Sequence, residues 1–139
     1  MPDKVIKRAP SPKGDVDRLK VLYIYKDFDI YNGLIETFLI LSKYQATMPF
    51  DFEVCVFNNR KDEYTRVFKE NGGSLINLKS KWESNPLIII KLYKLFKNKR
   101  PDIVQTFVLK PNLYGILAAL MAKVPVVIAT DFEGAHLLR

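Results

Sequence analysis

The chain has 139 residues, of which 48% are hydrophobic and 27% charged, so it is expected to be one domain with its own apolar core rather than a disordered, collagen-like or coiled-coil protein. A single cysteine, Cys55, excludes an internal disulfide and, with only one histidine present, a Cys/His zinc cluster. The 22 basic and 15 acidic residues leave a net charge of +7, which fits either an anionic partner or a well-solvated surface.

Residues 1–18 are predicted to form a flexible polar tail, and residues 19–139 to form the domain. The tail contains three prolines and many charges but no hydrophobic periodicity, so it buries too little to offset its ordering entropy. It also lacks the apolar segment of a secretory signal. No apolar run approaches the roughly 20 residues that a membrane helix needs. These features, with the single cysteine, predict a cytoplasmic protein.

Five predicted strands alternate with four predicted helices. Strands are indicated by short apolar or alternating runs, and helices by apolar residues at 3.6-residue spacing. Gly72-Gly73 ends the second helix, and Arg100-Pro101 ends the third, because the residue before proline avoids helical backbone. In chain order the predicted elements are strand 19–25, helix 33–46, strand 52–56, helix 61–71, strand 74–78, helix 86–99, strand 102–107, helix 111–123 and strand 126–130.

This alternation predicts an α/β fold, a doubly wound, Rossmann-like parallel sheet of about five strands with helices on both faces. Ligands of such sheets bind beyond the carboxyl ends of the strands, near the point where the strand order reverses. The candidate functional loops are therefore 26–33, 106–112 and 130–137.

The first candidate loop delivers Asn32 and Gly33 to the start of a helix, where free N–H groups favour anions. Gly33 would allow close approach of a phosphate or sugar, or the pair would simply cap and turn the helix. The three-glycine dinucleotide fingerprint is absent, which argues against a nicotinamide or flavin cofactor. The sequence also lacks a P-loop and the lysine of a receiver domain.

The other two loops add polar side chains to the same edge. Lys110 and Asn112 follow the fourth strand and are predicted either to contact an anion or to be a solvated lysine and a helix cap. After the fifth strand, Asp131 and Glu133 are candidate bases and His136 a candidate proton donor or orienting group, unless all three are only solvated.

Helix 86–99 has lysines on one face and apolar residues on the other. Such a helix either lies against an anionic membrane or covers the core of a soluble α/β domain. Nucleic acid is not an expected partner, because no helix-turn-helix, aromatic stacking motif or glycine-rich clamp is present.

Taken in order, four segments resemble the N-terminal domain of a GT-B glycosyltransferase of the family 4 type. The similarity covers about residues 19–134. The segments are the turn Asn32–Thr37, the strand Asp51–Val56, the Arg-Pro-Asp-Ile-Val strand at 100–106, and the Lys-Pro-Asn-Leu-Tyr-Gly helix from Lys110 with the Val-Pro-Val-Val-Ile strand that follows it.

The resemblance implies transfer of a sugar from a nucleotide-sugar donor, a co-substrate, to a lipid-linked or saccharide acceptor in the synthesis of a cell-surface polysaccharide or glycolipid, with no further cofactor or metal. It implies that this domain holds the acceptor and that a C-terminal domain or subunit binds the donor, so the chain alone is expected to be inactive. It also implies that the enzyme works at the inner membrane face. A non-catalytic binding subunit or a regulatory α/β module on the same scaffold is the alternative.

The family's motif positions assign Gly33 to close approach of a ligand, Lys110 and Asn112 to the cleft, and Gly134 to the loop after the fifth strand. The second glycine of the family's turn is Leu34 here. The two histidines of the family's fourth strand are replaced by Gln105 and Phe107, so no catalytic residue is assigned.

Overall fold

The computed structural model describes residues 18–81 and 85–130. It contains one five-stranded sheet in the order β3-β2-β1-β4-β5, in which every pair of neighbours is parallel. The predicted α/β fold class is confirmed. The elements are β1 Leu19–Tyr25, α1 Gly33–Lys43, a 3₁₀ turn η3 Gln45–Thr47, β2 Phe50–Val56, α2 Glu63–Glu70, β3 Leu75–Asn77, α3 Leu87–Lys99, β4 Ile103–Phe107, α4 Leu109–Met121 and β5 Val126–Thr130.

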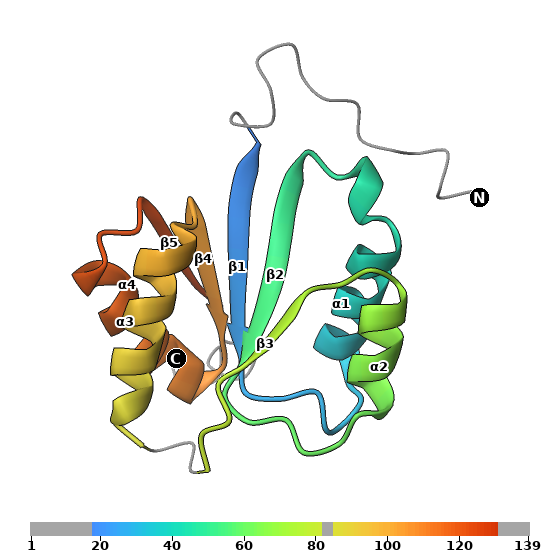
Figure 1. Cartoon of the computed structure of the whole chain (residues 1–139), viewed down its shortest axis with the longest axis horizontal. Coiled ribbons are helices and arrows are strands. Elements are labelled where there is room, and N and C mark those ends of the chain that lie inside the picture. The colour runs from blue at the N-terminus through green and yellow to red at the C-terminus, as the bar shows by residue number, and fades with distance from the viewer. Residues whose placement is uncertain (1–17, 82–84, 131–139) are drawn as a thin grey trace, which may run out of the picture.

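The helices cover the sheet in two layers, with α1 and α2 on one face and α3 and α4 on the other (Figure 1). The α1/α2 side is rich in aromatic rings, with Phe38 of α1 packed against Tyr23, Phe28 and Phe107. The opposite core is mainly aliphatic, although it includes the buried rings of Phe57 and Phe96, and we call it the aliphatic core. It also holds Cys55, whose burial raises the pKa of the thiol and keeps it in the protonated form that reacts poorly.

The central strand β1 is buried on both faces, which explains its nearly continuous apolar sequence. Its residues 21–25 are all buried, and it pairs with β2 on one side and β4 on the other. At its start, Arg18 is tied to β2, donating to the carbonyl of Met48 at 2.8 Å and to Asp51 at 3.3 Å. The rest of the predicted tail lies outside the described residues.

Helix boundaries differ from the predicted ones by one to three residues, and two of these differences have a local structural basis. Helix α1 ends at Lys43, and the chain continues into the 3₁₀ turn η3, so residues 44–46 are not α-helical. Helix α4 begins at Leu109 rather than Pro111, because a proline in the first turn lacks only an N–H that the helix does not use there. Gly72, with φ +97°, ends α2 in the left-handed conformation predicted for a helix terminus.

No helix within the described part of the chain is both long and apolar enough to cross a membrane.

Helix α4 lies directly on β4 because Gly115 has no side chain. A Cβ added to Gly115 would lie 2.5 Å from Cγ2 of Thr106, a fully buried residue of β4, while the next nearest atoms would be 3.6 Å or more away. A single methyl group of Thr106 therefore sets how closely this helix approaches the sheet.

We expect Gly115→Ala to lower the free energy of unfolding by about 1–3 kcal/mol, the usual cost of overpacking a core. Thr106→Ser removes Cγ2 but keeps the hydroxyl. In that background Gly115→Ala should cost little, since alanine is the better helix former. Urea unfolding of the four proteins measures this coupling. Equal losses in both backgrounds would contradict the assignment.

Candidate functional site

The strand order brings the loops after β1 and β4 together at one edge of the sheet. β1 and β4 are neighbours, but the chain leaves β1 toward α1 on one face and leaves β4 toward α4 on the other (Figure 1). This is the point of strand-order reversal at which open parallel sheets bind ligands. We call this edge, formed by the carboxyl ends of the strands, the carboxyl edge.

Asn32 caps α1 at the carboxyl edge, which is one of the two roles predicted for it. Its Oδ1 accepts a hydrogen bond from the Ile35 N–H at 2.9 Å, and its Nδ2 donates to the Tyr25 hydroxyl at 3.1 Å. Among the described residues, the N–H groups of Gly33 and Leu34 have no acceptor. They remain available to an anion at the positive end of the helix.

Gly33 faces open space, since a Cβ placed on it would have no neighbour within 4 Å. Its φ is not in the left-handed region, so the backbone does not require glycine there. The side chain of Leu34, which replaces the family's second glycine, is half-buried and packs against the aromatic core. Ligand contact by Asn32 and Gly33 stays a prediction.

Side-chain hydrogen bonds hold the β1–α1 loop to the β2–α2 loop. The Asp29 carboxylate accepts from the backbone N–H groups of Arg60 and Lys61, both at 2.9 Å, and Asn59 accepts from the N–H of Phe28 at 2.6 Å. Asp27 in turn accepts from the N–H of Asp29. These acids serve the loop itself. No group of His, Cys, Asp or Glu in residues 18–81 and 85–130 is arranged to hold a metal ion.

Asn112 joins the ends of β4 and β5 rather than capping α4. Its Oδ1 accepts from the Thr106 hydroxyl at 2.6 Å, and its Nδ2 donates to the carbonyl of Thr130 at 3.3 Å. Gln105, at a position where the family has histidine, donates to the Thr130 hydroxyl at 2.9 Å. Because both ends of the Asn112 amide are engaged, we assign it a positioning role.

The remaining predicted site residues fall in two groups. Lys110 lies half-buried in the first turn of α4, at the carboxyl edge, and its contact with a ligand stays a prediction. Asp131, Glu133, Gly134 and His136 lie outside the described residues, and β5 ends directly before them at the same edge.

An aromatic pair at this edge was not predicted from the sequence. The rings of Tyr31 and Tyr64 lie 5.3 Å apart, and Tyr31 is 47% exposed. Partial desolvation and the nearby Glu36 carboxylate raise the pKa of the Tyr31 phenol. Tyr64 lies at the start of α2, and nothing local in the sequence links it to the β1–α1 loop.

The β4–α4 junction contains a strained residue. Val108 has φ 63° and ψ 174°, a region that β-branched residues rarely adopt. Its N–H donates to the Thr130 carbonyl at 3.0 Å, and Asn112 holds the same carbonyl. The tie to β5 thus maintains the backbone turn that starts α4 at the carboxyl edge.

We expect Val108→Gly to be more stable than Val108→Ala by about 1 kcal/mol or more, because only glycine relieves a cost of about 1–3 kcal/mol at this φ and ψ. Both variants lose the contacts of the two γ-methyl groups with the core, and glycine loses those of Cβ as well, so alanine is the control that keeps the strain. Thermal and urea unfolding measure the difference. An alanine variant as stable as the glycine variant would show that Val108 is not strained.

Comparison with known proteins supports the resemblance to glycosyltransferases that the sequence motifs indicated. The model of the glycosyl transferase 4-like family matches residues 35–135. A curated relative from Campylobacter jejuni, N,N'-diacetylbacillosaminyl-diphospho-undecaprenol alpha-1,3-N-acetylgalactosaminyltransferase, is 37% identical over 70 residues, which are 47% of this chain and 19% of that protein. The chain thus matches about a fifth of that relative's length.

The crystal structure of a glycosyltransferase from Rickettsia africae has a similar fold, with a TM-score of 0.62 and 18% identity. The similarity covers 84% of this chain and 30% of the Rickettsia chain. The parallel sheet and the family match over residues 35–135 lead to one conclusion: the chain belongs to the glycosyl transferase 4-like family.

Proposed function

We propose that this chain is the acceptor-binding side of a glycosyltransferase that moves a sugar from a nucleotide-sugar to a lipid-linked or saccharide acceptor. Family membership supports glycosyl transfer. The name of the Campylobacter relative, which describes a sugar carried on diphospho-undecaprenol, supports an acceptor that contains a diphosphate.

The observation that carries this proposal is the pair of helix starts at the carboxyl edge. The N–H groups of Gly33 and Leu34, which have no acceptor among residues 18–81 and 85–130, lie at the start of α1. Lys110 lies at the start of α4, across the β1/β4 boundary. Backbone N–H groups at the positive end of a helix and a lysine suit the diphosphate of a lipid-linked sugar. The exposed Tyr31 offers an apolar surface beside them.

In the transfer we propose, an acceptor hydroxyl oxygen bonds to the anomeric carbon of the donor sugar. The bond from that carbon to the diphosphate oxygen breaks, the nucleoside diphosphate leaves with the electron pair, and the hydroxyl proton passes to a base. A C-terminal domain or a separate subunit supplies the donor site, so this chain alone is expected to be inactive. No residue of the described chain is assigned as the base.

The proposed location is the cytoplasmic side of a membrane, with peripheral contact through charge. Helix α3 exposes Lys91, Lys94, Lys97 and Lys99, while its Ile88, Leu92 and Phe96 are buried in the aliphatic core. Because these apolar residues already pack against the sheet, α3 would meet anionic lipid by electrostatic attraction rather than by inserting them.

The test compares two ligands with the purified chain by calorimetry. We expect a short-chain prenyl-diphospho-N-acetylhexosamine to bind, and a nucleotide-sugar to bind weakly or not at all. Asn32→Asp retains an acceptor for the Ile35 N–H, so α1 should stay capped. Its negative charge beside Gly33 should weaken the acceptor analogue at least about tenfold.

Lys43→Gln is the control, because it lowers the net charge by the same amount at the far end of α1. It should leave the affinity unchanged. Tighter binding of the nucleotide-sugar than of the acceptor analogue would refute the acceptor assignment. Equal weakening by both variants would show that only overall charge matters.

A further inference from the structure

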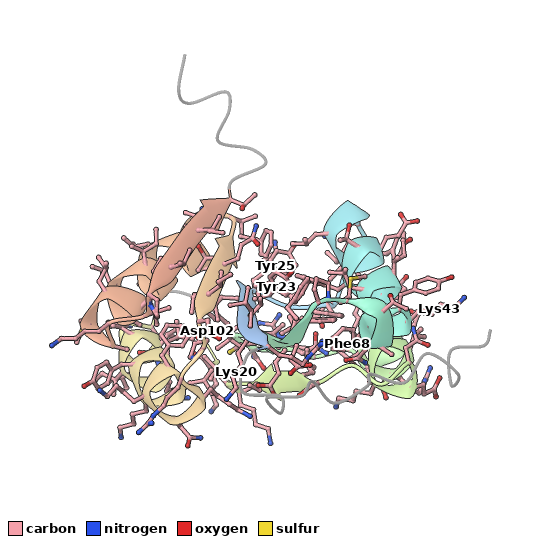
Figure 2. The ribbon with its side chains drawn as sticks, turned by 90° about the horizontal axis from the view of Figure 1, so that it is seen from above. Lys20, Tyr23, Tyr25, Lys43, Phe68 and Asp102 are labelled. Carbon is pink, nitrogen blue, oxygen red and sulfur yellow. The ribbon has the colours of Figure 1, made fainter. Side chains whose placement is uncertain are left out.

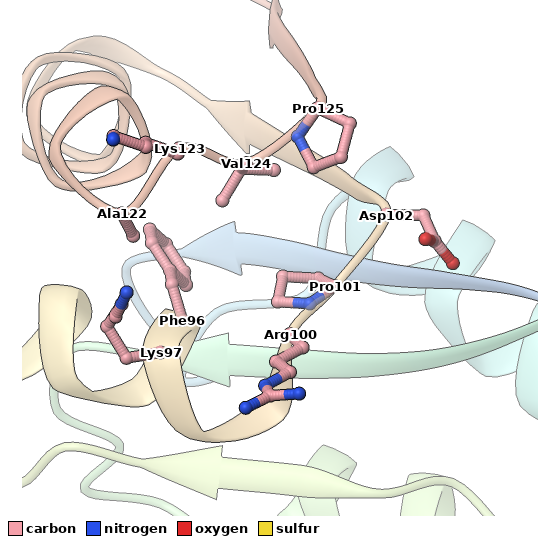
Figure 3. Close-up of a pocket in the computed structure, with 9 residues that line it drawn as sticks. All are labelled: Phe96, Lys97, Arg100, Pro101, Asp102, Ala122, Lys123, Val124 and Pro125. Carbon is pink, nitrogen blue, oxygen red and sulfur yellow. The ribbon is translucent and has the colours of Figure 1, made fainter.

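A pocket of about 410 Å³ lies at the opposite, amino edge of the sheet, away from the site described above. It is formed where α3 and α4 end and where β4 and β5 begin (Figure 3). We call it the amino-edge pocket. Its lining residues are Phe96, Lys97, Arg100, Pro101, Asp102, Ala122, Lys123, Val124 and Pro125.

The pocket carries unneutralised positive charge. Within residues 18–81 and 85–130, Lys97, Arg100 and Lys123 form no ion pair with a carboxylate. The only acid in the lining, Asp102, accepts a hydrogen bond from the N–H of Lys20 at 2.9 Å. Figure 3 shows its carboxylate turned away from Lys97 and Lys123.

Two of the cations occupy backbone positions that favour other residues. Arg100 has φ 52° and Lys123 has φ 61°, in the left-handed region where a helix usually ends with glycine or asparagine. Backbone geometry therefore does not account for a cation at either position. Each of the two turns is held by a hydrogen bond, from the N–H of Arg100 to Phe96 at 2.9 Å and from the N–H of Lys123 to Leu120 at 3.2 Å.

Cations at the end of a helix also offset the partial negative charge of its last carbonyl groups. That charge is about half a unit for each helix. Two helix ends together therefore balance about one of the three cations, and an excess of positive charge remains. The buried Phe96 and Pro101 give the pocket an apolar floor, and the three cations are long, exposed side chains at its lining.

We propose that the amino-edge pocket binds a phosphate group, as a phosphomonoester or phosphodiester, held by Lys97, Arg100 and Lys123. Lysine and arginine both donate charge-assisted hydrogen bonds to phosphate oxygens, and the pocket is large enough to admit the group. The ligand is either the headgroup of an anionic phospholipid or a soluble phosphorylated compound. This proposal is independent of glycosyl transfer.

The first arm of the test titrates the chain with inorganic phosphate and follows the backbone amide resonances. The amide resonances of Arg100, Asp102, Ala122 and Lys123 should shift. Shifts of amide resonances at the carboxyl edge would report phosphate binding at that separate site. Lys97→Gln, Arg100→Asn and Lys123→Asn each remove one charge, and asparagine tolerates the left-handed backbone. Each single variant should weaken phosphate binding about fivefold.

The control is the variant Lys43→Gln, Lys69→Gln, Lys81→Gln, which removes three exposed cations that lie outside both this pocket and helix α3. It is compared with the variant that combines the three pocket substitutions. Only the pocket variant should lose phosphate binding. No shift at the four pocket amides, or equal losses in the two triple variants, would overturn the proposal.

The second arm distinguishes the source of the phosphate by sedimentation with vesicles of phosphatidylglycerol or of phosphatidylcholine. Binding to phosphatidylglycerol alone, lost in the pocket variant and reduced by added phosphate, would identify a lipid headgroup. Phosphate binding without vesicle binding would identify a soluble ligand. Vesicle binding that both triple variants lose equally would overturn a headgroup site in the pocket.

Discussion

The architecture depends on the burial of residues 21–25 of β1 between two strands and two helical layers. Residues 21–25 place alternate side chains in the aromatic core and in the aliphatic core, and the strand hydrogen-bonds to β2 and β4. A shift of one residue would exchange the two sets of side chains, so the register is strongly specified. With β1 in this register, α1 and α4 start at the same edge on opposite faces (Figure 1).

Most of the side chains between the two helical layers are not available for chemistry. In the sheet viewed from above, Tyr23 and Tyr25 point from the central strand toward the same side of the sheet (Figure 2). Tyr23 contributes its ring to the core, while the Tyr25 hydroxyl reaches Asn32 at the carboxyl edge. The packing thus positions the helix cap Asn32 and, with it, the exposed backbone of the next residue, Gly33.

The two edges of the sheet present positive charge in different ways. At the carboxyl edge, the N–H groups of Gly33 and Leu34 are free within the described part of the chain, whereas the polar side chains of Asp29 and Asn112 hold the loops in place. At the amino edge, the side chains of Arg100 and Lys123 carry the charge, on turns that hydrogen bonds hold. Backbone recognition suits a ligand in a fixed orientation, and long cationic side chains suit a phosphate approaching from solvent.

Local sequence patterns predicted the fold because alternating β and α periodicities and the Arg100-Pro101 and Gly72-Gly73 signals act over a few residues. The start of α4 was misplaced because Pro111 is an equally good first-turn residue inside a helix that begins earlier. The link from Asn112 to Thr130, the contact between Tyr31 and Tyr64 and the convergence on the amino-edge pocket join residues far apart in sequence. Such partners depend on three-dimensional packing that no local pattern contains.

We propose that the loops after β1 and β4 form one anion site at the carboxyl edge. The most direct test adds a spin-labelled diphosphate to the isotopically labelled chain that carries Lys97→Gln, Arg100→Asn and Lys123→Asn, so that the amino-edge pocket does not compete. The amide signals of Gly33 and Lys110 should broaden together and recover when unlabelled diphosphate is added. Broadening of one without the other, or of neither, would contradict a single site at the carboxyl edge.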